Sequence, residues 1–152
     1  MKVQLNMAIG EKLWEENGDV TGFKITKVHP VEGVTMEVSF VSEIRGIGRF
    51  PSGKNLGSGT VTQYPHGMVD GSYHGSIMTT AEGGSSSGAD QFVWWAHEKT
   101  KAVEDGKFQG LTLVTGFTNS QKLSWMNNLI IVLDLETNPE SQTFNATASE
   151  WK

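Results

Sequence analysis

The sequence predicts an all-β protein: one antiparallel β-barrel of eight or nine strands that spans residues 1–152 as a single domain. Three observations point there. Short runs of alternating or continuous apolar residues recur along the chain with brief connections between them, as they do in sandwiches and barrels. At most one segment, near residues 119–127, reads as a short helix. Glycine is frequent, with 18 in 152 residues, and several lie inside strand patterns, where a barrel needs bends.

The N-terminal half contains four of these strand patterns. Residues 2–7 alternate loosely, and Asn17-Gly18 is a strong hairpin signal, so 11–28 is interpreted as a hairpin rather than as a helical turn over 11–16. Residues 34–44 alternate clearly between apolar and polar positions, 45–55 form a Gly/Pro/Ser-rich loop, and 56–64 return to strand.

The C-terminal half follows the same scheme. Residues 69–79 and 90–98 are strand patterns separated by a polar, flexible loop at 81–88. A charged connection at 99–107 leads to a strand at 108–115, and Thr118 or Asn119 can cap the short helix. Residues 129–135 are apolar at nearly every position, which predicts a strand buried on both sides, and the last strand covers 143–151.

Composition excludes several classes of function. A net charge of −5 and a pI near 5.3 disfavour nucleic acid and anionic membranes as partners. Without cysteine the chain has no disulfide, thiolate metal site or cysteine nucleophile. The first residues lack an apolar signal core, and no window reaches the length of a membrane helix, so a cytoplasmic protein is expected.

The C-terminal third carries a recognisable pattern. The run TGFTNSQKLSWMNNLIIVLDLE and the final SEWK resemble segments of small bacterial and archaeal barrel proteins of no known function. A weaker similarity extends to GSIMTTAEG and VHPVEGVTMEV. These proteins resemble the allene oxide cyclase-like barrels within the lipocalin-like group. The resemblance implies an eight-stranded antiparallel barrel that can form homo-oligomers; it implies no activity, because none of the cyclase's functional residues matches a motif here.

Pocket candidates come from the two strand patterns around the 81–88 loop. If Tyr73 faces the barrel interior, Trp95 and His97 can face it too, and a one-residue change of register brings His74 there instead. Both alternatives remain open at this stage, because a loop of that length does not fix the register. The candidate pocket residues are Glu37, Tyr73, His74, Trp95 and His97.

A metal site is the less favoured interpretation of the histidines. His66, His74 and His97, with Glu37 or Asp70 as a fourth ligand, match no ligand spacing of a known site, so neither a metal nor a cofactor is predicted.

Two further positions are unusual. Asp134 interrupts an apolar run, and we expect it at a solvated strand end, in an ion pair, rather than inside the barrel. Trp94 and Trp95 send one indole to each side of the sheet, so one fills the barrel and the other meets solvent or a partner. Trp94 and Trp125 are the candidates for a subunit contact.

Three functions compete. The first choice is a non-catalytic, filled barrel that serves as an oligomeric or interaction module, because Met36, Val38, Phe40 and residues 129–135 can fill the interior. The alternatives are a barrel that binds a small apolar ligand and an isomerase- or cyclase-like enzyme acting in the cavity. No Ser-based triad motif is present, and the sequence leaves open whether the protein is an enzyme.

Overall fold

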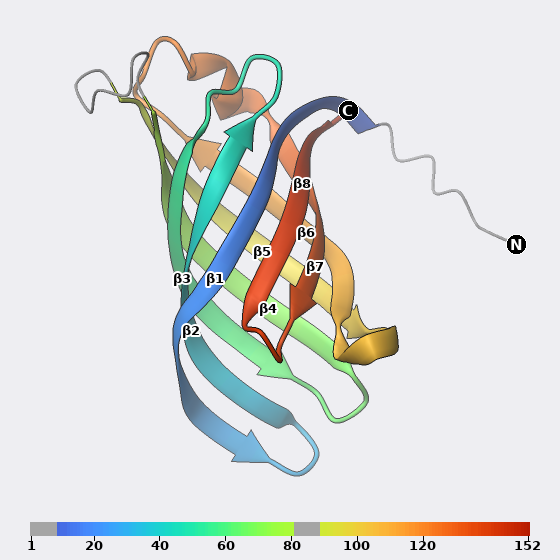
Figure 1. Cartoon of the computed structure of the whole chain (residues 1–152). Helices are drawn as coiled ribbons and strands as arrows, with labels where there is room; N and C mark the ends of the chain where they lie inside the picture. The colour runs from blue at the N-terminus through green and yellow to red at the C-terminus, as the bar shows by residue number, and fades with distance from the viewer. Residues whose placement is uncertain (1–8, 81–88) are drawn as a thin grey trace, which may run out of the picture.

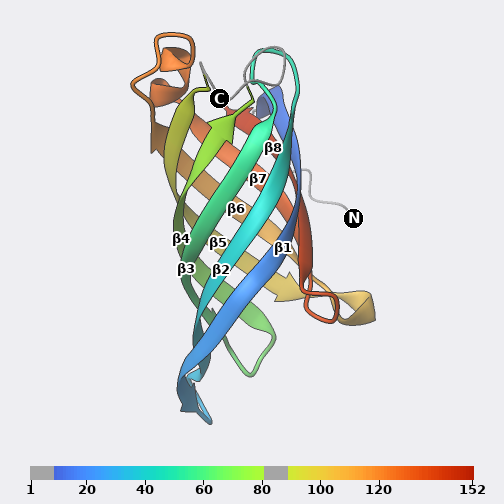
Figure 2. The same ribbon diagram turned by 60° about the vertical axis from the view of Figure 1, so that its left-hand side comes forward.

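The computed structural model describes residues 9–80 and 89–152, which form a closed barrel of eight antiparallel strands (Figures 1 and 2). Each strand pairs with the next along the chain, and β8 pairs back with β1, so the order around the barrel is the order of the sequence. The predicted fold class is confirmed. The strands are β1 (Ile9–His29), β2 (Gly33–Gly46), β3 (Gly53–Gln63), β4 (Met68–Thr79), β5 (Gln91–Ala102), β6 (Phe108–Phe117), β7 (Ile130–Asn138) and β8 (Thr143–Trp151).

Helical structure in the described residues is limited to two short 3₁₀ segments, η2 (Glu104–Gly106) and η3 (Ser124–Asn128). The short helix expected near 119–127 is therefore a 3₁₀ segment that lies slightly later. Leu123 and Met126, three residues apart, are both buried, and a 3₁₀ helix places such residues on one side. No helix in 9–80 or 89–152 is long and apolar enough to cross a membrane.

The hairpin expected over 11–28 is wrong, because β1 runs straight through Asn17-Gly18 as one strand. Gly18 serves packing instead of a turn. A Cβ atom there would lie 2.2 Å from Cζ of Phe144, so the Phe144 ring occupies the space above this glycine. In the sequence, an Asn-Gly pair that forms a hairpin turn cannot be distinguished from one whose glycine leaves space for a neighbouring aromatic ring.

Several boundaries also differ from the sequence prediction. β3 begins at Gly53, within the loop expected over 45–55, and β5 continues to Ala102, into the expected charged connection. β7 is not buried on both sides, since Ile130 and Asp134 are exposed. The strand expected at 2–7 and the loop at 81–88 lie outside the described residues.

The two ends of the barrel differ. At the closed end, near η3 at the top of Figure 1, inward side chains from the strands meet Phe50 from the β2–β3 turn and Leu123 and Met126 from the segment around η3. This core is packed, and its members are 0–6% exposed. The other residues of the core are Leu13, Trp14, Ile44, Ile77, Phe92, Trp94, Val114, Ile131 and Ala148.

At the open end lie the β1–β2, β3–β4, β5–β6 and β7–β8 turns. Here β1 loses one neighbour: its pairing with β8 ends at Asp19 and Thr143, whereas its pairing with β2 continues to His29. The remainder of β1 and the start of β2 form an arm that projects beyond the β7–β8 turn (Figure 1, bottom). Phe23, Ile25 and Val28 of this arm are exposed.

Candidate ligand site inside the barrel

A cavity of about 390 Å³ occupies the open half of the barrel. The cavity begins at the packed core, where Trp14 and Trp94 line it. It extends to the open end, where Phe23 and Gln142 line it. Interior filling, expected from the sequence, is therefore limited to the closed half. A volume of this size is typical of small-molecule sites.

The wall of the cavity is largely apolar. Strand alternation places every second residue inside, and most of these positions are aliphatic or aromatic. Phe40 lies at the centre of an aromatic cluster, with ring centroids 5.7 Å from Tyr73, 6.0 Å from Trp94 and 5.5 Å from Phe144. Other apolar lining residues are Val20, Met36, Val38, Val61, Val69, Ile77, Ala96, Phe108, Val114, Leu133 and Leu135.

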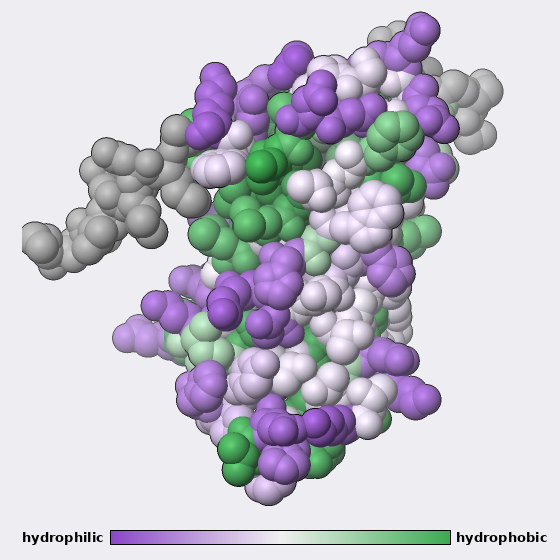
Figure 3. Space-filling model, turned by 180° about the vertical axis from the view of Figure 1, so that it is seen from behind, coloured by the Kyte–Doolittle hydropathy of each residue, from purple (hydrophilic) through white to green (hydrophobic). Residues whose placement is uncertain are grey.

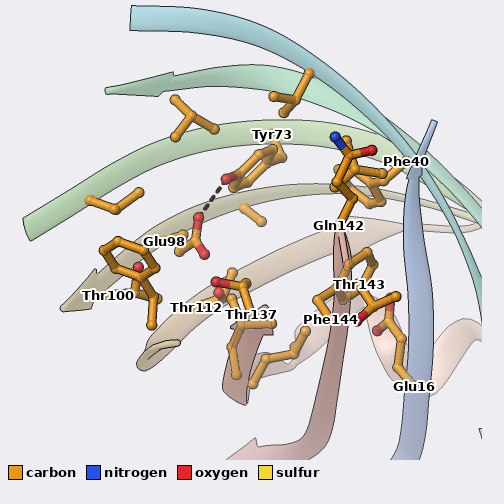
Figure 4. Close-up of a pocket in the computed structure, with 18 of the residues that line it drawn as sticks. Glu16, Phe40, Tyr73, Glu98, Thr100, Thr112, Thr137, Gln142, Thr143 and Phe144 are labelled. Atoms are coloured by element: carbon orange, nitrogen blue, oxygen red, sulfur yellow. Dashed lines mark hydrogen bonds between the residues drawn. The ribbon is translucent and has the colours of Figure 1, made fainter. Parts of the chain in front are cut away.

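Among the polar groups of this wall is a hydrogen-bonded pair: the Tyr73 hydroxyl donates a hydrogen bond to Oε2 of Glu98 (Figure 4). In the strand register Glu98 lies between Gly71 on β4 and Thr112 on β6. Gly71 makes the pair possible, because a Cβ there would lie 2.5 Å from the Tyr73 hydroxyl oxygen.

Burial controls the ionisation of the pair. The Glu98 residue is 3% exposed, and loss of solvation raises the pKa of its carboxyl, while the hydrogen bond from Tyr73 opposes that shift. Burial, followed by the charge of Glu98, raises the pKa of the Tyr73 hydroxyl, which therefore stays protonated and acts as the donor.

A second buried carboxyl, Glu16, lies at the floor of the cavity and is fully engaged. Its Oε1 accepts from Trp14 Nε1 at 3.0 Å, and its Oε2 accepts from Ser42 Oγ at 2.5 Å and Asn55 Nδ2 at 3.1 Å. Asn55 Oδ1 in turn accepts from Trp94 Nε1 at 2.7 Å. This network joins β1, β2, β3 and β5, and its role is structural, since burial raises the pKa of Glu16 while three donors satisfy it.

Of the five pocket candidates, the structure places only Tyr73 on the cavity wall. Tyr73 is opposite Ala96, and His74 is opposite Trp95, so His74 and Trp95 both point outward. His97 is opposite Ser72, also outside, and Glu37 is exposed on the outer face of β2. The alternative that grouped His74 with Trp95 and His97 has the observed register, but that face is the outside of the barrel. The alternative that grouped Tyr73 with Trp95 and His97 is wrong, because Tyr73 faces the even-numbered residues of β5.

The outward residues make their own small cluster. His97 Nε2 lies 3.1 Å from Asp70 Oδ1, and His97 Nδ1 lies 3.3 Å from Ser72 Oγ. The order Asp–His–Ser resembles a catalytic triad, but the cluster lies on an exposed sheet face whose backbone N–H groups bond to neighbouring strands. The paired strands in the described part of the chain therefore leave no backbone N–H beside this cluster to form an oxyanion hole.

The histidines do not converge. His66 stacks on Tyr64 in the β3–β4 turn, with centroids 5.4 Å apart, while His74 lies beside Ser58 on the outer face. Within 9–80 and 89–152, no group of three or more metal-ligating side chains is close enough to hold an ion.

The interface candidates are also placed differently from the prediction. Trp94 is 6% exposed inside the barrel, so it cannot contact a partner, whereas Trp95 is 57% exposed. Trp125 is partly covered by Arg49, whose guanidinium carbon lies 3.8 Å from the ring centroid. Asp134 is exposed, as expected, but it lies in the middle of β7 rather than at a strand end, and no ion pair among the described residues includes it.

Exposed apolar side chains gather on the outer face of β3, β5 and β6. We call Leu56, Trp95, Leu113 and Phe117 the outer apolar patch; each is more than half exposed. β5 and β6 lie at the back of the barrel in Figure 1, and Figure 3 views that side, with hydrophobic side chains concentrated in its upper half.

Sequence reasoning missed Glu98 and Glu16 as the carboxyls of the cavity. The signal for Glu98 was its position: it shares the alternation of Phe92, Trp94 and Ala96, which marks the buried face of β5. Alternation alone does not show whether this face of β5 points into the barrel; the pairing register of β5 with its neighbours shows it.

Comparison with known proteins supports the fold and no specific activity. No family model and no curated protein matches the chain. A protein of unknown function from Clostridium acetobutylicum is 15% identical with a TM-score of 0.76, covering 93% of this chain and 98% of that one. A β-barrel-like protein from Acinetobacter baumannii is 13% identical with a TM-score of 0.74, covering 93% and 94%. An enzyme from Penicillium herquei is 17% identical with a TM-score of 0.64, covering 92% of each chain.

Proposed function

We propose that the barrel binds one small, largely apolar molecule in its cavity. The observation that carries this proposal is a barrel that is packed at one end and hollow at the other. Its cavity measures about 390 Å³, and the cavity wall is largely apolar. Binding sites for small molecules share that composition. Glu98 and Tyr73 provide the polar anchor that orients the molecule.

A blocked mouth tests the proposal. Val69 lines the cavity near the open end, so Val69→Trp should abolish the fluorescence increase of the neutral dye Nile red and its displacement by octanol. Lys101→Trp is the matched control, since Lys101 is exposed on the adjacent strand. Failure of the wild-type protein to bind either compound, or equal binding by both variants, would contradict a cavity site.

A second candidate function is assembly through the outer apolar patch. Patches of exposed apolar side chains commonly mark protein–protein contacts, and Trp95 is an effective anchor residue. Assembly through this patch is compatible with ligand binding, because the patch lies on the outer face of the barrel whereas the cavity opens at the end of the barrel.

A catalytic role is the third candidate. A buried carboxyl with a raised pKa on a largely apolar cavity wall is the kind of group that transfers protons in isomerases and cyclases. Turnover of a ligand found by binding, with loss of turnover in Glu98→Gln, would establish it.

Two further proposals accompany the function. Kinship with the allene oxide cyclase-like, lipocalin-like barrels is supported by the closed eight-stranded topology. A cytoplasmic location is supported by the absence of cysteine, and cell fractionation tests it.

A further inference from the structure

The polar groups of the cavity carry only one sign of charge. Among its lining residues are two glutamates, Glu16 and Glu98, and no lysine, arginine or histidine. A site for a fatty acid or another organic anion would need a cation or several donors aimed at the acid group. The described lining offers an anion only neutral hydroxyl and amide donors, whereas its two glutamates can pair with a cation, so the cavity favours a cation over an anion.

Glu98 has unused capacity for a ligand. Oε2 accepts the hydrogen bond from Tyr73, and Oε1 accepts none from the described residues. No fully buried side-chain nitrogen or oxygen in the described residues lacks a partner, so Oε1 is reached from the cavity. Glu16, with three donors, has no comparable capacity.

The surroundings of Glu98 suit a positively charged nitrogen. Thr112 lies opposite Glu98 on β6 and Thr100 lies two residues further along β5; both line the cavity (Figure 4). Their hydroxyl oxygens, with the free carboxylate oxygen, provide three acceptors for the three hydrogens of an ammonium group.

We propose that the cavity takes an organic amine, an apolar body with a protonated nitrogen, held by Glu98 with Thr100 and Thr112. The proposal rests on the cavity being a ligand site and names the chemistry of its ligand. Tyr73 supports it as a positioning residue, because its hydroxyl stabilises the ionised carboxylate that pairs with the ammonium group.

Proton release follows from this pairing. Burial raises the pKa of Glu98 in the empty barrel, and a bound cation beside the carboxyl lowers that pKa again, so binding shifts Glu98 toward its ionised form and releases a proton at any pH where the empty barrel holds one. The titratable groups near Glu98 are Tyr73 inside and Asp70 and His97 on the outer face. On β6 the facing residue is Thr112, which does not titrate, so the released proton comes from Glu98.

Isothermal titration calorimetry with octylamine, octanol and octanoate tests the proposal, because the three ligands share one chain and differ in charge. Octylamine should bind about tenfold or more tightly than octanol, as expected for a desolvated ion pair, and octanoate should bind weakest. Repeating the octylamine titration in two buffers of different ionisation enthalpy should show release of up to one proton, whereas octanol should release none.

The variants separate this inference from the proposed function. Glu98→Gln should reduce octylamine binding to the level of octanol and leave octanol binding in place. Glu37→Gln, which removes an exposed carboxyl from the outer face, should change neither. Octanol binding without any preference for octylamine or proton release would overturn the amine proposal alone; failure of all three ligands would overturn the cavity site itself.

Discussion

Glu98 is the residue at which stability and the proposed binding function conflict. A carboxyl at 3% exposure with one side-chain donor is costly to ionise, and it would be unfavourable in a barrel that only had to fold. The cost is visible as a pH dependence of stability.

Burial raises the pKa of Glu98 in the folded state, so the folded protein holds this proton up to a higher pH than the unfolded chain does. Above about pH 4.3, where an unfolded glutamate ionises, the free energy of unfolding should fall as the pH rises through the folded pKa. Urea unfolding from about pH 4 to about pH 8 should show a smaller decline for Glu98→Gln than for the wild-type protein.

Glu16, whose pKa is also raised by burial, accounts for the decline that remains in that variant. Glu37→Gln should keep the full wild-type slope, since Glu37 is exposed. Identical slopes for Glu98→Gln and the wild-type protein would show that Glu98 is not buried as described.

Glu16, unlike Glu98, stabilises the folded barrel, because three buried side-chain donors need its carboxyl as their acceptor. Glu16→Ala leaves the donors of Trp14, Ser42 and Asn55 without their acceptor inside the barrel and should cost about 3 kcal/mol or more in unfolding free energy. The adjacent Glu15 pairs with Arg45 on the exposed face, so Glu15→Ala should change the urea midpoint little. Equal losses in the two variants would refute the network.

At the scale of the element, β1 shows what one glycine permits. Gly18→Ala places a methyl group against the Phe144 ring and should destabilise the barrel by about 1–3 kcal/mol. Phe144→Leu should recover part of that loss in the double variant, as thermal unfolding can measure.

Gly22→Ala is the control on the same strand. Its nearest neighbour to an added Cβ is the Ser39 hydroxyl at 3.2 Å, which can rotate away. A loss as large as that of Gly18→Ala would mean that backbone freedom, rather than the Phe144 ring, explains the glycine.

The sequence was sufficient for elements whose pattern is local. The predicted bounds of β2 and β8 lie close to the observed ones, because the residue pattern within each strand marks where the strand begins and ends. β1 was missed because its central glycine is explained by Phe144, a residue more than a hundred positions away.

The site was harder to predict than the fold, because it depends on register. Tyr73 lines the cavity, but its hydrogen-bond partner there is Glu98 and not Trp95 or His97, the neighbours that the sequence suggests. Alternation divides each strand into two faces and does not say which face is inside. Trp94 and Trp95, equal in the sequence, illustrate this most directly.

At the scale of the whole molecule, the outer apolar patch predicts self-association. The wild-type protein should form a dimer or larger oligomer in size-exclusion chromatography with light scattering, and Trp95→Glu should shift it toward monomer by placing a charge in the contact. Asn145→Glu, an exposed change on β8, should have no such effect. A wild-type protein that is monomeric at all concentrations would exclude this interface.

The division of the barrel into a packed end and a hollow end has an evolutionary consequence. Phe50, Leu123 and Met126 pack the closed end against inward residues of the strands, while the proposed ligand cavity is lined by residues that lie toward the other ends of those strands. Substitutions near the mouth can therefore alter what is bound without removing the contacts that fold the chain. Such a barrel can acquire new ligands by exchange of a few inward side chains, and proteins sharing its backbone need share no chemistry.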